Sequence, residues 1–375
     1  MIVGGRVVTP GGVLDPGWVR FDAGRIDAVG AGEPPPTQEP TLDVDGRWVL
    51  PGFVDLHVHG GGGASHQEGD AAEVARVVEL HRGHGTTTML ASLVTAPLAD
   101  LERSTAALAD LVDDGLIAGV HLEGPFLAAA RCGAHDPALL RPPAPADLDR
   151  LLAAGRGTVR MVTIAPELDG GVDAVARLAG DGVIAAVGHT DATHARTVAA
   201  IEAGARVATH LFNGMRGLHH REPGPVLALL DDGRVTVELI NDGVHLHPAL
   251  VRSVVRAVGP ARVALITDAM AAAGAGDGDY LLGGLPVVVR DGVARLADGA
   301  AVAGSTLTLD AALRHAVAAG LSVPEVAHSL ATTPARVLGI DTGAVEPGLA
   351  ADLVILNDDL TVHAVLHRGE WAQPL

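Results

Sequence analysis

The hydrophobic pattern of the chain changes near residue 50. Before this point, short strand-like runs are separated by turn residues, for example at 22–24, which is typical of a small antiparallel sheet. After it, eight near-continuous apolar runs alternate with amphipathic stretches of helical periodicity. The apolar runs are 48–56, 86–94, 117–122, 159–164, 183–187, 206–209, 235–240 and 262–267. The amphipathic stretches are 71–83, 97–113, 145–154, 171–179, 192–203 and 248–258.

Apolar strands that alternate with helices predict a parallel sheet with helices on both faces. Eight such units fit a (β/α)8 TIM barrel better than an open, doubly wound sheet. No Gly-Xaa-Gly-Xaa-Xaa-Gly motif opens a helix, which also disfavours a dinucleotide-binding sheet. We therefore predict an α/β fold built on a TIM barrel.

The remaining segments predict a second, smaller domain. An Asp-Gly pair between alternating runs predicts a β-hairpin insertion near 285–296. Helical patterns then resume at 308–319, 324–330 and 334–338, and the tail is strand-like again at 352–356 and 362–367. We expect this tail to join the N-terminal strands in a small discontinuous β-sandwich. The expected domains are 51–341 for the barrel and 1–50 with 342–375 for the small domain.

Composition limits the classes of partner. The formal net charge of −19 argues against nucleic acid and anionic membranes, although local arginines still allow a small anionic substrate. No apolar stretch reaches the roughly 18 residues that span a bilayer. The N-terminus lacks a signal-peptide pattern, and the single cysteine, Cys132, has no partner for an intramolecular disulfide. We expect a cytoplasmic protein.

Lysine is absent: all 26 basic residues are arginine. This excludes Schiff-base chemistry and P-loop phosphate binding, both of which need lysine. It also excludes a carboxylated lysine as a bridge between two metal ions.

Polar residues follow the apolar runs, at the barrel end where TIM-barrel enzymes place their active sites. His57 and His59 follow the first run, and their i, i+2 spacing puts both on one face of a strand. Alone, this pair would be equally compatible with a turn. Other run ends carry His121 and Glu123, His189 and Asp191, His210 and Asn213, Asn241, Asp242 and His245, and Asp268. Ligand-type residues at most of the eight run ends favour one shared metal site.

The residue types indicate which chemistry such a site supports. Imidazole and carboxylate ligands suit Zn²⁺, Fe²⁺ or Mn²⁺ better than Ca²⁺ or Mg²⁺. A single cysteine rules out a cysteine-rich structural zinc site, which leaves a catalytic site with an open position. A bound metal lowers the pKa of its water from 15.7 to about 7. Asp268 is our candidate for the carboxylate that takes the water proton and passes it to a leaving group.

With these residues in order, the sequence resembles the amidohydrolase superfamily. The opening stretch 51–60 (PGFVDLHVHG) and the closing stretch 348–354 (GLAADLV) carry this resemblance. Within the superfamily, the sequence is similar to the N-acetylglucosamine-6-phosphate deacetylase family. The matching stretches are 121–126 (HLEGPF), 188–190 (GHT), 209–215 (THLFNGM), 221–224 (REPG) and 267–269 (TDA). The resemblance implies hydrolysis of N-acetyl-D-glucosamine 6-phosphate to D-glucosamine 6-phosphate and acetate, in amino-sugar catabolism and cell-wall sugar recycling.

The resemblance also implies a metal site of one or two divalent ions per subunit. The implied ligands are His57, His59, Glu123, His189, His210 and Asp268. Glu123 would bridge two ions, and Asp268 would also touch the first. His57 and His59 match the second-ion positions, which some family members lack. Zinc is the expected metal, with iron, manganese, cobalt and cadmium as alternatives.

The same resemblance assigns roles toward the substrate. Asp268 matches the catalytic acid and base, and His135 matches a residue that polarises the substrate carbonyl. The implied substrate contacts are His135, Asn213, Gly214, Arg221 and His245. The planar guanidinium of Arg221 suits a phosphate and would act across a homodimer interface. Its alternative role is to cap the Pro-Gly turn that follows it.

Two other functions stay open at this point. One is a different amidohydrolase, such as a cyclic-amide hydrolase, an N-acyl-D-amino-acid deacylase or another amino-sugar phosphate deacetylase. The other is a non-enzymatic scaffold or sugar-responsive regulator on a barrel fold. Cys132, beside His135 in sequence, is either an inert small residue or an oxidation-sensitive thiol.

Overall fold

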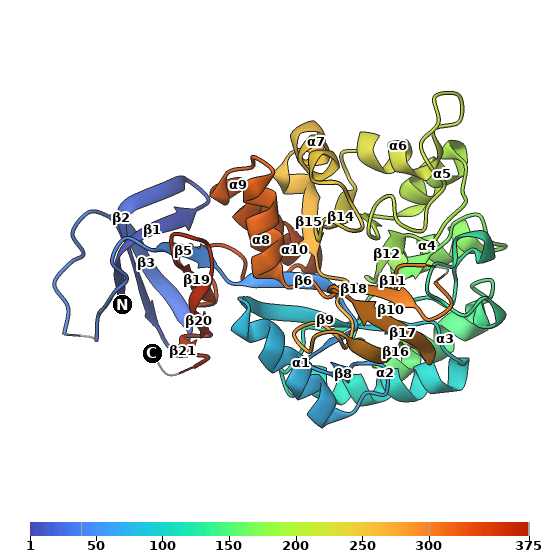
Figure 1. The fold of residues 1–375 in the computed structure, drawn as a ribbon, viewed down its shortest axis with the longest axis horizontal. Coiled ribbons are helices and arrows are strands. Elements are labelled where there is room, and N and C mark those ends of the chain that lie inside the picture. The colour runs from blue at the N-terminus through green and yellow to red at the C-terminus, as the bar shows by residue number, and fades with distance from the viewer. Residues whose placement is uncertain (39, 300, 374–375) are drawn as a thin grey trace.

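The computed structural model describes residues 1–38, 40–299 and 301–373; the last two residues of the predicted small domain, 374 and 375, lie outside this part. It confirms the predicted fold: a parallel eight-stranded barrel sheet surrounded by helices, with a β domain built from both termini beside it (Figure 1). The barrel strands are β6 (Phe53–Val58), β9 (Thr86–Val94), β10 (Val120–Glu123), β11 (Val159–Ile164), β12 (Ile184–Val187), β13 (Val207–Ala208), β14 (Thr236–Ile240) and β15 (Val263–Ile266).

Helices follow the barrel strands, as the amphipathic stretches predict. They are α1 (Ala71–Gly83), α2 (Leu98–Asp113), α3 (Pro145–Gly155), α4 (Gly171–Gly180), α5 (His194–Ala203), α6 (Gly224–Asp231), α7 (Pro248–Val258), α8 (Leu309–Ala318), α9 (Val323–Ala327) and α10 (Thr333–Leu338). A π-helical turn, His328–Thr332, joins α9 to α10. In the described residues, 3₁₀ turns occupy Ala129–Arg131, Pro137–Leu139 and Pro260–Arg262. Helix α6 was not predicted, because Pro223, Gly224 and Pro225 at its start resemble a turn.

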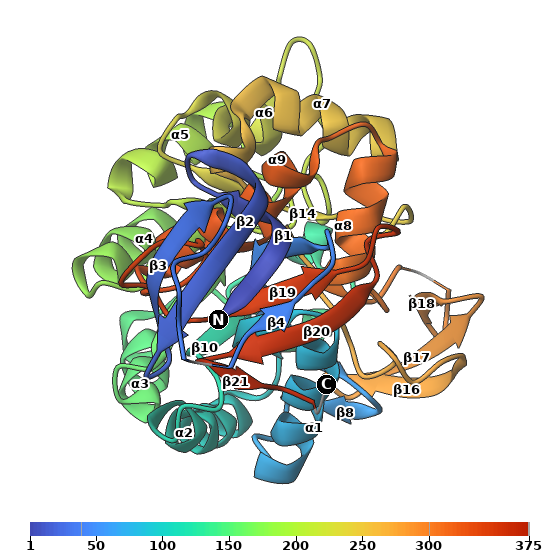
Figure 2. The ribbon, with the colours of Figure 1, turned by 90° about the vertical axis from the view of Figure 1, so that its left-hand side faces the viewer.

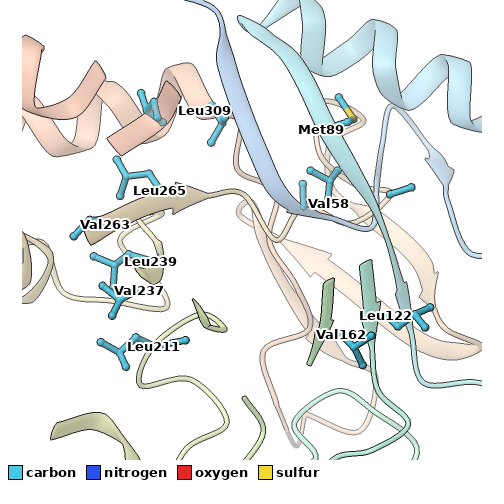
Figure 3. Close-up of a cluster of buried hydrophobic side chains, with 14 of the residues drawn as sticks. Val58, Met89, Leu122, Val162, Leu211, Val237, Leu239, Val263, Leu265 and Leu309 are labelled. Carbon is cyan, nitrogen blue, oxygen red and sulfur yellow. The ribbon is translucent and has the colours of Figure 1, made fainter. Parts of the chain in front are cut away.

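The hydrophobic core lies between the strands and the surrounding helices. Figure 3 shows side chains from several strands in this layer, with Leu265 of β15 close to Leu309 of α8. A second cluster fills the barrel, where Leu56 and Met161 pack in one group with Leu338 of α10. Because both faces of each strand are buried, the strands have the continuous apolar sequences from which they were predicted.

Asp55 connects the first and last barrel strands. Its carboxylate accepts the Thr267 hydroxyl at 2.6 Å and the backbone N–H groups of His57 and Thr267 at 3.2 and 3.3 Å. The Asp268 N–H also donates to the His57 carbonyl at 2.9 Å. Complete burial raises the pKa of Asp55 to about 7, against the hydrogen bonds that lower it. This junction fixes the two strand ends that carry His57 and Asp268.

The termini form one hydrogen-bonded sheet with a separate core, seen face-on in Figure 2. Its strands are β1 (Ile2–Thr9), β2 (Gly12–Asp22), β3 (Arg25–Ala31), β4 (Leu42–Asp43), β5 (Trp48–Pro51), β19 (Leu353–Leu356), β20 (Val362–His367) and β21 (Glu370–Trp371). The single run predicted at 48–56 is therefore two strands. β5 pairs with β19, and the chain crosses into the barrel at Gly52, where a Cβ would lie 2.3 Å from the Thr87 hydroxyl.

The described residues also form two smaller sheets outside the barrel sheet. β17 (Leu285–Arg290) and β18 (Val293–Leu296) form the predicted hairpin around Asp291 and Gly292. β16 (Gly278–Leu282) pairs with β17 as a third strand, which was not predicted. β7 (Gly60–Gly61) pairs with β8 (Ala64–Ser65) just after His59. No helix in the described part of the chain is long and apolar enough to cross a membrane.

Candidate active site

Six predicted ligands meet at the carboxyl end of the barrel. Each lies at or just after the end of a strand: His57 and His59 at β6, Glu123 at β10, His189 at β12, His210 at β13 and Asp268 at β15. All six side chains are buried. Strand ends that are far apart in the sequence converge here because parallel strands share one edge of the barrel.

The carboxylate of Glu123 stands between two histidine pairs. Its Oε2 atom lies 3.1 Å from Nε2 of His59 and 3.3 Å from Nε2 of His57. Its Oε1 atom lies 2.8 Å from Nε2 of His210 and 3.1 Å from Nε2 of His189. Within each pair the two Nε2 atoms are 3.0 and 3.1 Å apart. One carboxylate is thus shared by two groups of ring nitrogens, which is the arrangement of a bridging ligand.

Asp268 belongs geometrically to the first of these groups. Its Oδ1 atom lies 3.2 Å from Nε2 of His59 and 3.6 Å from Nε2 of His57. The resemblance instead grouped Asp268 with the ion held by His189 and His210. In the structure, four ligand atoms from His57, His59, Glu123 and Asp268 lie within 4.8 Å of one another.

Hydrogen bonds from the far side of the rings set their tautomers. Nδ1 of His59 donates to the Ser92 carbonyl at 3.2 Å, and Nδ1 of His189 donates to the Arg131 carbonyl at 2.8 Å. A carbonyl can only accept, so in the neutral rings Nε2 carries the lone pair and points toward Glu123. Lone pairs and carboxylate oxygens then face each other, and only a positive charge between them makes this arrangement favourable.

The close packing of carboxylates and imidazoles in this cluster shifts their pKa values. Burial alone would raise the pKa of Glu123, but the surrounding histidines, His57 foremost, hold this pKa well below its usual range. The pKa of Asp268 is likewise lowered, because His57 and His59 outweigh burial. Burial alone would lower the pKa of His57, but the two carboxylates raise it well above normal. Both carboxylates are therefore ionised and available to a cation or a proton.

His135 faces the cluster from the loop after β10. Its Nδ1 atom accepts the backbone N–H of Thr95 at 3.3 Å and contacts the Thr95 hydroxyl at 2.9 Å. Burial, together with the neighbouring His189, lowers the pKa of His135 to about 3. The ring is therefore neutral, and because Nδ1 accepts a bond, we assign the proton to Nε2, which lies 3.6 Å from Glu123 Oε2.

A cavity of about 220 Å³ opens above these ligands. Three of the predicted substrate contacts, Asn213, Gly214 and His245, line it together with His135. Nδ1 of His245 is 2.7 Å from Asp242 Oδ2, and this bond raises the pKa of His245 against the lowering effect of burial. An apolar wall comes from Val94, Leu282, Ala301 and Val302.

Arg221 is a predicted site residue that the structure places away from both the ligand cluster and the cavity. Its guanidinium is exposed and contacts the neighbouring His220 ring at 2.9 Å. Within the described ranges, no arginine lines the cavity. One copy of the chain therefore brings together the predicted metal and carbonyl contacts but leaves the predicted phosphate contact outside.

Gly214 has a positional reason to be glycine. Its φ is +61°, and a Cβ there would lie 2.8 Å from Nδ1 of His189. Gly133 approaches the same ring, with a Cβ position 3.2 Å from its Cε1 atom. These two glycines let the backbone pack directly against the imidazole of His189.

Several residues that support the site were not identified from the sequence. Ser92 and Thr95 contact the rings of His59 and His135 from β9 and the residue after it. Glu238 of β14 is fully buried, and its Oε2 accepts the backbone N–H of His210 at 3.2 Å. An acidic residue inside an apolar strand is a sequence signal that could have revealed Glu238.

Comparison with known proteins identifies the family. The family model described as "Amidohydrolase family" matches residues 48–372, which is most of the chain and includes all six predicted ligands. The chain belongs to the amidohydrolase family. This confirms the resemblance found in the sequence.

Relatives and solved structures refine this assignment. The chain is 39% identical to an N-acetylgalactosamine-6-phosphate deacetylase of Escherichia coli O157:H7, over 98% of this chain and 97% of that protein. It is 35% identical to an N-acetylglucosamine-6-phosphate deacetylase of Bacillus subtilis, over 98% and 95%. Among solved structures, it matches a mutant N-acetyl-D-glucosamine-6-phosphate deacetylase of Mycobacterium smegmatis in complex with N-acetyl-D-glucosamine-6-phosphate. That match has 50% identity, a TM-score of 0.96, and coverage of 100% of this chain and 99% of the other.

Proposed function

We propose that this amidohydrolase hydrolyses the acetamide bond of N-acetyl-D-glucosamine 6-phosphate, releasing acetate and D-glucosamine 6-phosphate. The observation that carries the proposal is Glu123, shared by two histidine pairs and flanked by Asp268 and His135 around one cavity. The 50% identity to the Mycobacterium smegmatis deacetylase, whose structure contains this sugar phosphate, supports the choice of substrate.

The ligand set fits a divalent metal. Around a tetrahedral ion with metal–nitrogen distances of about 2.0–2.1 Å, ligand atoms lie about 3.3–3.4 Å apart. The spacings around Glu123 run from 2.8 to 3.3 Å, close to this value. His189, His210 and Glu123 would hold one ion, and His57, His59, Asp268 and Glu123 a second. Imidazole and carboxylate ligands favour zinc, with iron, manganese, cobalt and cadmium as alternatives.

Bound in this site, the metal supplies Lewis acidity toward water and the acetyl carbonyl. Nε2–H of His135 points into the cavity and donates to the carbonyl oxygen as negative charge develops there. Asp268, ionised in the resting protein, accepts a proton from the attacking water. It then returns this proton to the nitrogen of the leaving amine. A single carboxylate thus acts first as base and then as acid.

We propose that a second copy of the chain binds the phosphate end of the substrate. Because Arg221 is exposed and lies outside the cavity of its own chain, we propose that it reaches the cavity of a partner in a homodimer. Leu218 on the same loop has 56% of its surface exposed, which gives this loop apolar area to bury. The acidic net charge elsewhere makes nucleic acid and membrane partners unfavourable. A cytoplasmic location stays a prediction.

A mixing experiment tests the action of Arg221 in the partner's site. Arg221→Ala and Asp268→Asn variants are each expected to lose activity. If Arg221 acts across the interface, mixed dimers contain one intact site, and a refolded equal mixture recovers about a quarter of wild-type activity. If Arg221 acts within its own chain, no mixed dimer has an intact site, and no recovery is seen.

A substrate panel tests the reaction itself. Acetate release is measured on metal-reconstituted protein with the phosphorylated and unphosphorylated forms of N-acetylglucosamine, N-acetylgalactosamine and N-acetylmannosamine. We expect a marked preference for phosphorylated sugars and turnover of the glucosamine form. The second candidate substrate is the epimer N-acetylgalactosamine 6-phosphate, because the Escherichia coli relative is named as the deacetylase of that sugar phosphate. Turnover of N-acyl amino acids in preference to any sugar phosphate would contradict both candidates.

A further inference from the structure

Asp191 lies where three loops of the active site meet. The first loop follows β10 and carries His135; the second follows β12 and carries His189; the third follows β13 and carries Asn213 and Gly214. Asp191 is on the second loop, two residues after His189. The proposed reaction uses side chains from all three loops, yet it assigns no role to this carboxylate.

Each oxygen of Asp191 binds an arginine from a different loop. Oδ1 accepts Nε and Nη2 of Arg131 at 2.9 and 2.8 Å, and Oδ2 accepts Nη2 of Arg216 at 2.7 Å. The three side chains are between 30% and 37% exposed, so solvent only partly screens the pairs. Asp191 itself is held by Glu167, which accepts its backbone N–H at 2.5 Å.

The ion pair with Arg131 connects Asp191 to His189, one of the proposed metal ligands. The carbonyl of Arg131 accepts Nδ1–H of His189 at 2.8 Å, and the N–H of Ala128 donates to the carbonyl of His189 at 3.0 Å. The ring orientation that points Nε2 at Glu123 therefore depends on where the residue Arg131 lies. The ion pair with Asp191 fixes that residue through its side chain.

The ion pair with Arg216 connects Asp191 to the backbone of residues 213–214, which lines the cavity. The N–H of Thr190 donates to the Gly214 carbonyl at 2.9 Å, and the N–H of Arg216 donates to the Thr190 carbonyl at 3.0 Å. The second and third loops thus run together as a short parallel bridge. The ion pair with Asp191 closes this bridge at its outer end, next to Asn213 and Gly214 in the cavity wall.

We propose that Asp191 is a positioning residue that holds these three loops in register through Arg131 and Arg216. It sets the orientation of His189 toward the metal and the place of the 213–214 backbone toward the substrate. The inference deepens the proposed deacetylase function, and the part that concerns the substrate rests on that function. The part that concerns the metal does not depend on this function, because zinc binding is measured without turnover.

The variant Asp191→Asn keeps the size of the side chain and removes its charge. The matched control is Asp232→Asn: Asp232 also pairs with an arginine, Arg234 at 2.7 Å, but it lies after α6 and outside the cavity lining. Each chelator-treated protein is titrated with zinc alone, and kcat, KM and Tm are measured. We expect Asp191→Asn to lose about 10- to 100-fold in zinc affinity and in kcat/KM, as is typical of groups that orient metal ligands. Asp232→Asn should stay within about twofold of wild type on both, and Asp191→Glu should recover part of the loss.

Variants that remove only one of the two arginines keep the test decisive if Asp191→Asn folds poorly. Arg131→Gln should mainly weaken zinc binding, and Arg216→Gln should mainly raise KM. The proposal is overturned if Asp191→Asn binds zinc and turns over substrate as the control does, or if both arginine variants leave zinc affinity and KM unchanged. A wild-type protein that binds zinc but hydrolyses none of the sugar phosphates refutes the proposed function, while the zinc titrations still decide the role of Asp191.

Discussion

Replacing Gly214 with alanine tests whether the backbone of the third loop positions His189. The new Cβ would lie 2.8 Å from Nδ1 of His189, whereas ordinary contact begins at 3.4 Å. The ring or the loop must therefore move by about 0.6 Å. This nitrogen is the one that donates to the Arg131 carbonyl, so the displacement strains the bond that orients the ligand.

The energetic consequence has two parts. A φ of +61° disfavours alanine by about 1–2 kcal/mol, whatever surrounds it. The weakened hydrogen bond of His189 adds about 0.5–1.5 kcal/mol. We expect the unfolding free energy to fall by about 1.5–3.5 kcal/mol in total. The metal affinity should fall about 10- to 100-fold because a ligand ring is misoriented.

The control separates these two parts. Gly182 has a φ of +76° and open space around its Cβ position, in the loop between α4 and β12. Gly182→Ala should show the backbone penalty alone, with wild-type metal affinity and kcat/KM. Urea unfolding and zinc titration of both variants provide the measurements. If Gly214→Ala binds zinc and turns over substrate as well as Gly182→Ala does, the contact with His189 does not position the ligand.

Three further predictions follow from the site and its surroundings. Asp268→Asn should lose about 10²–10⁴-fold in kcat while it retains metal, because the amide cannot accept the water proton; near-full activity would refute its role as base. His57→Ala with His59→Ala should bind one ion fewer than wild type by elemental analysis, because the other histidine pair faces the opposite oxygen of Glu123; an unchanged metal count would contradict this. Burial lowers the pKa of His81 to about 4, so protonation favours the unfolded chain, and stability falls as pH drops from about 6.5 toward 4. Between pH 7.5 and 5 this amounts to about 2 kcal/mol, and urea unfolding of His81→Gln should show a pH dependence weaker by that amount.

The barrel and most of its site were predictable because their sequence signals are local. A strand buried on both faces is apolar throughout, and ligand residues at its end stand out against it. The same property hid the boundary at Gly52, since β5 and β6 are both buried and read as one run. Arg221 shows what local signals cannot give. Its motif predicts a phosphate contact, but its position outside the cavity of its own chain depends on tertiary structure.

The backbone conformation of three predicted ligands could not have been read from any sequence pattern. His189, His210 and Asp268 have φ values of +45°, +27° and +49°, in a region that residues other than glycine rarely adopt. Each such residue costs about 1–3 kcal/mol and persists only where its surroundings enforce it. For Asp268 the surroundings are two backbone bonds: its N–H donates to His57, and its carbonyl accepts the N–H of Ser305 at 2.7 Å. For His210 the enforcing contact is Glu238. The direction of these side chains is therefore set by the closed barrel and its buried contacts, so the ligand geometry is a property of the whole fold rather than of the motifs that identified it.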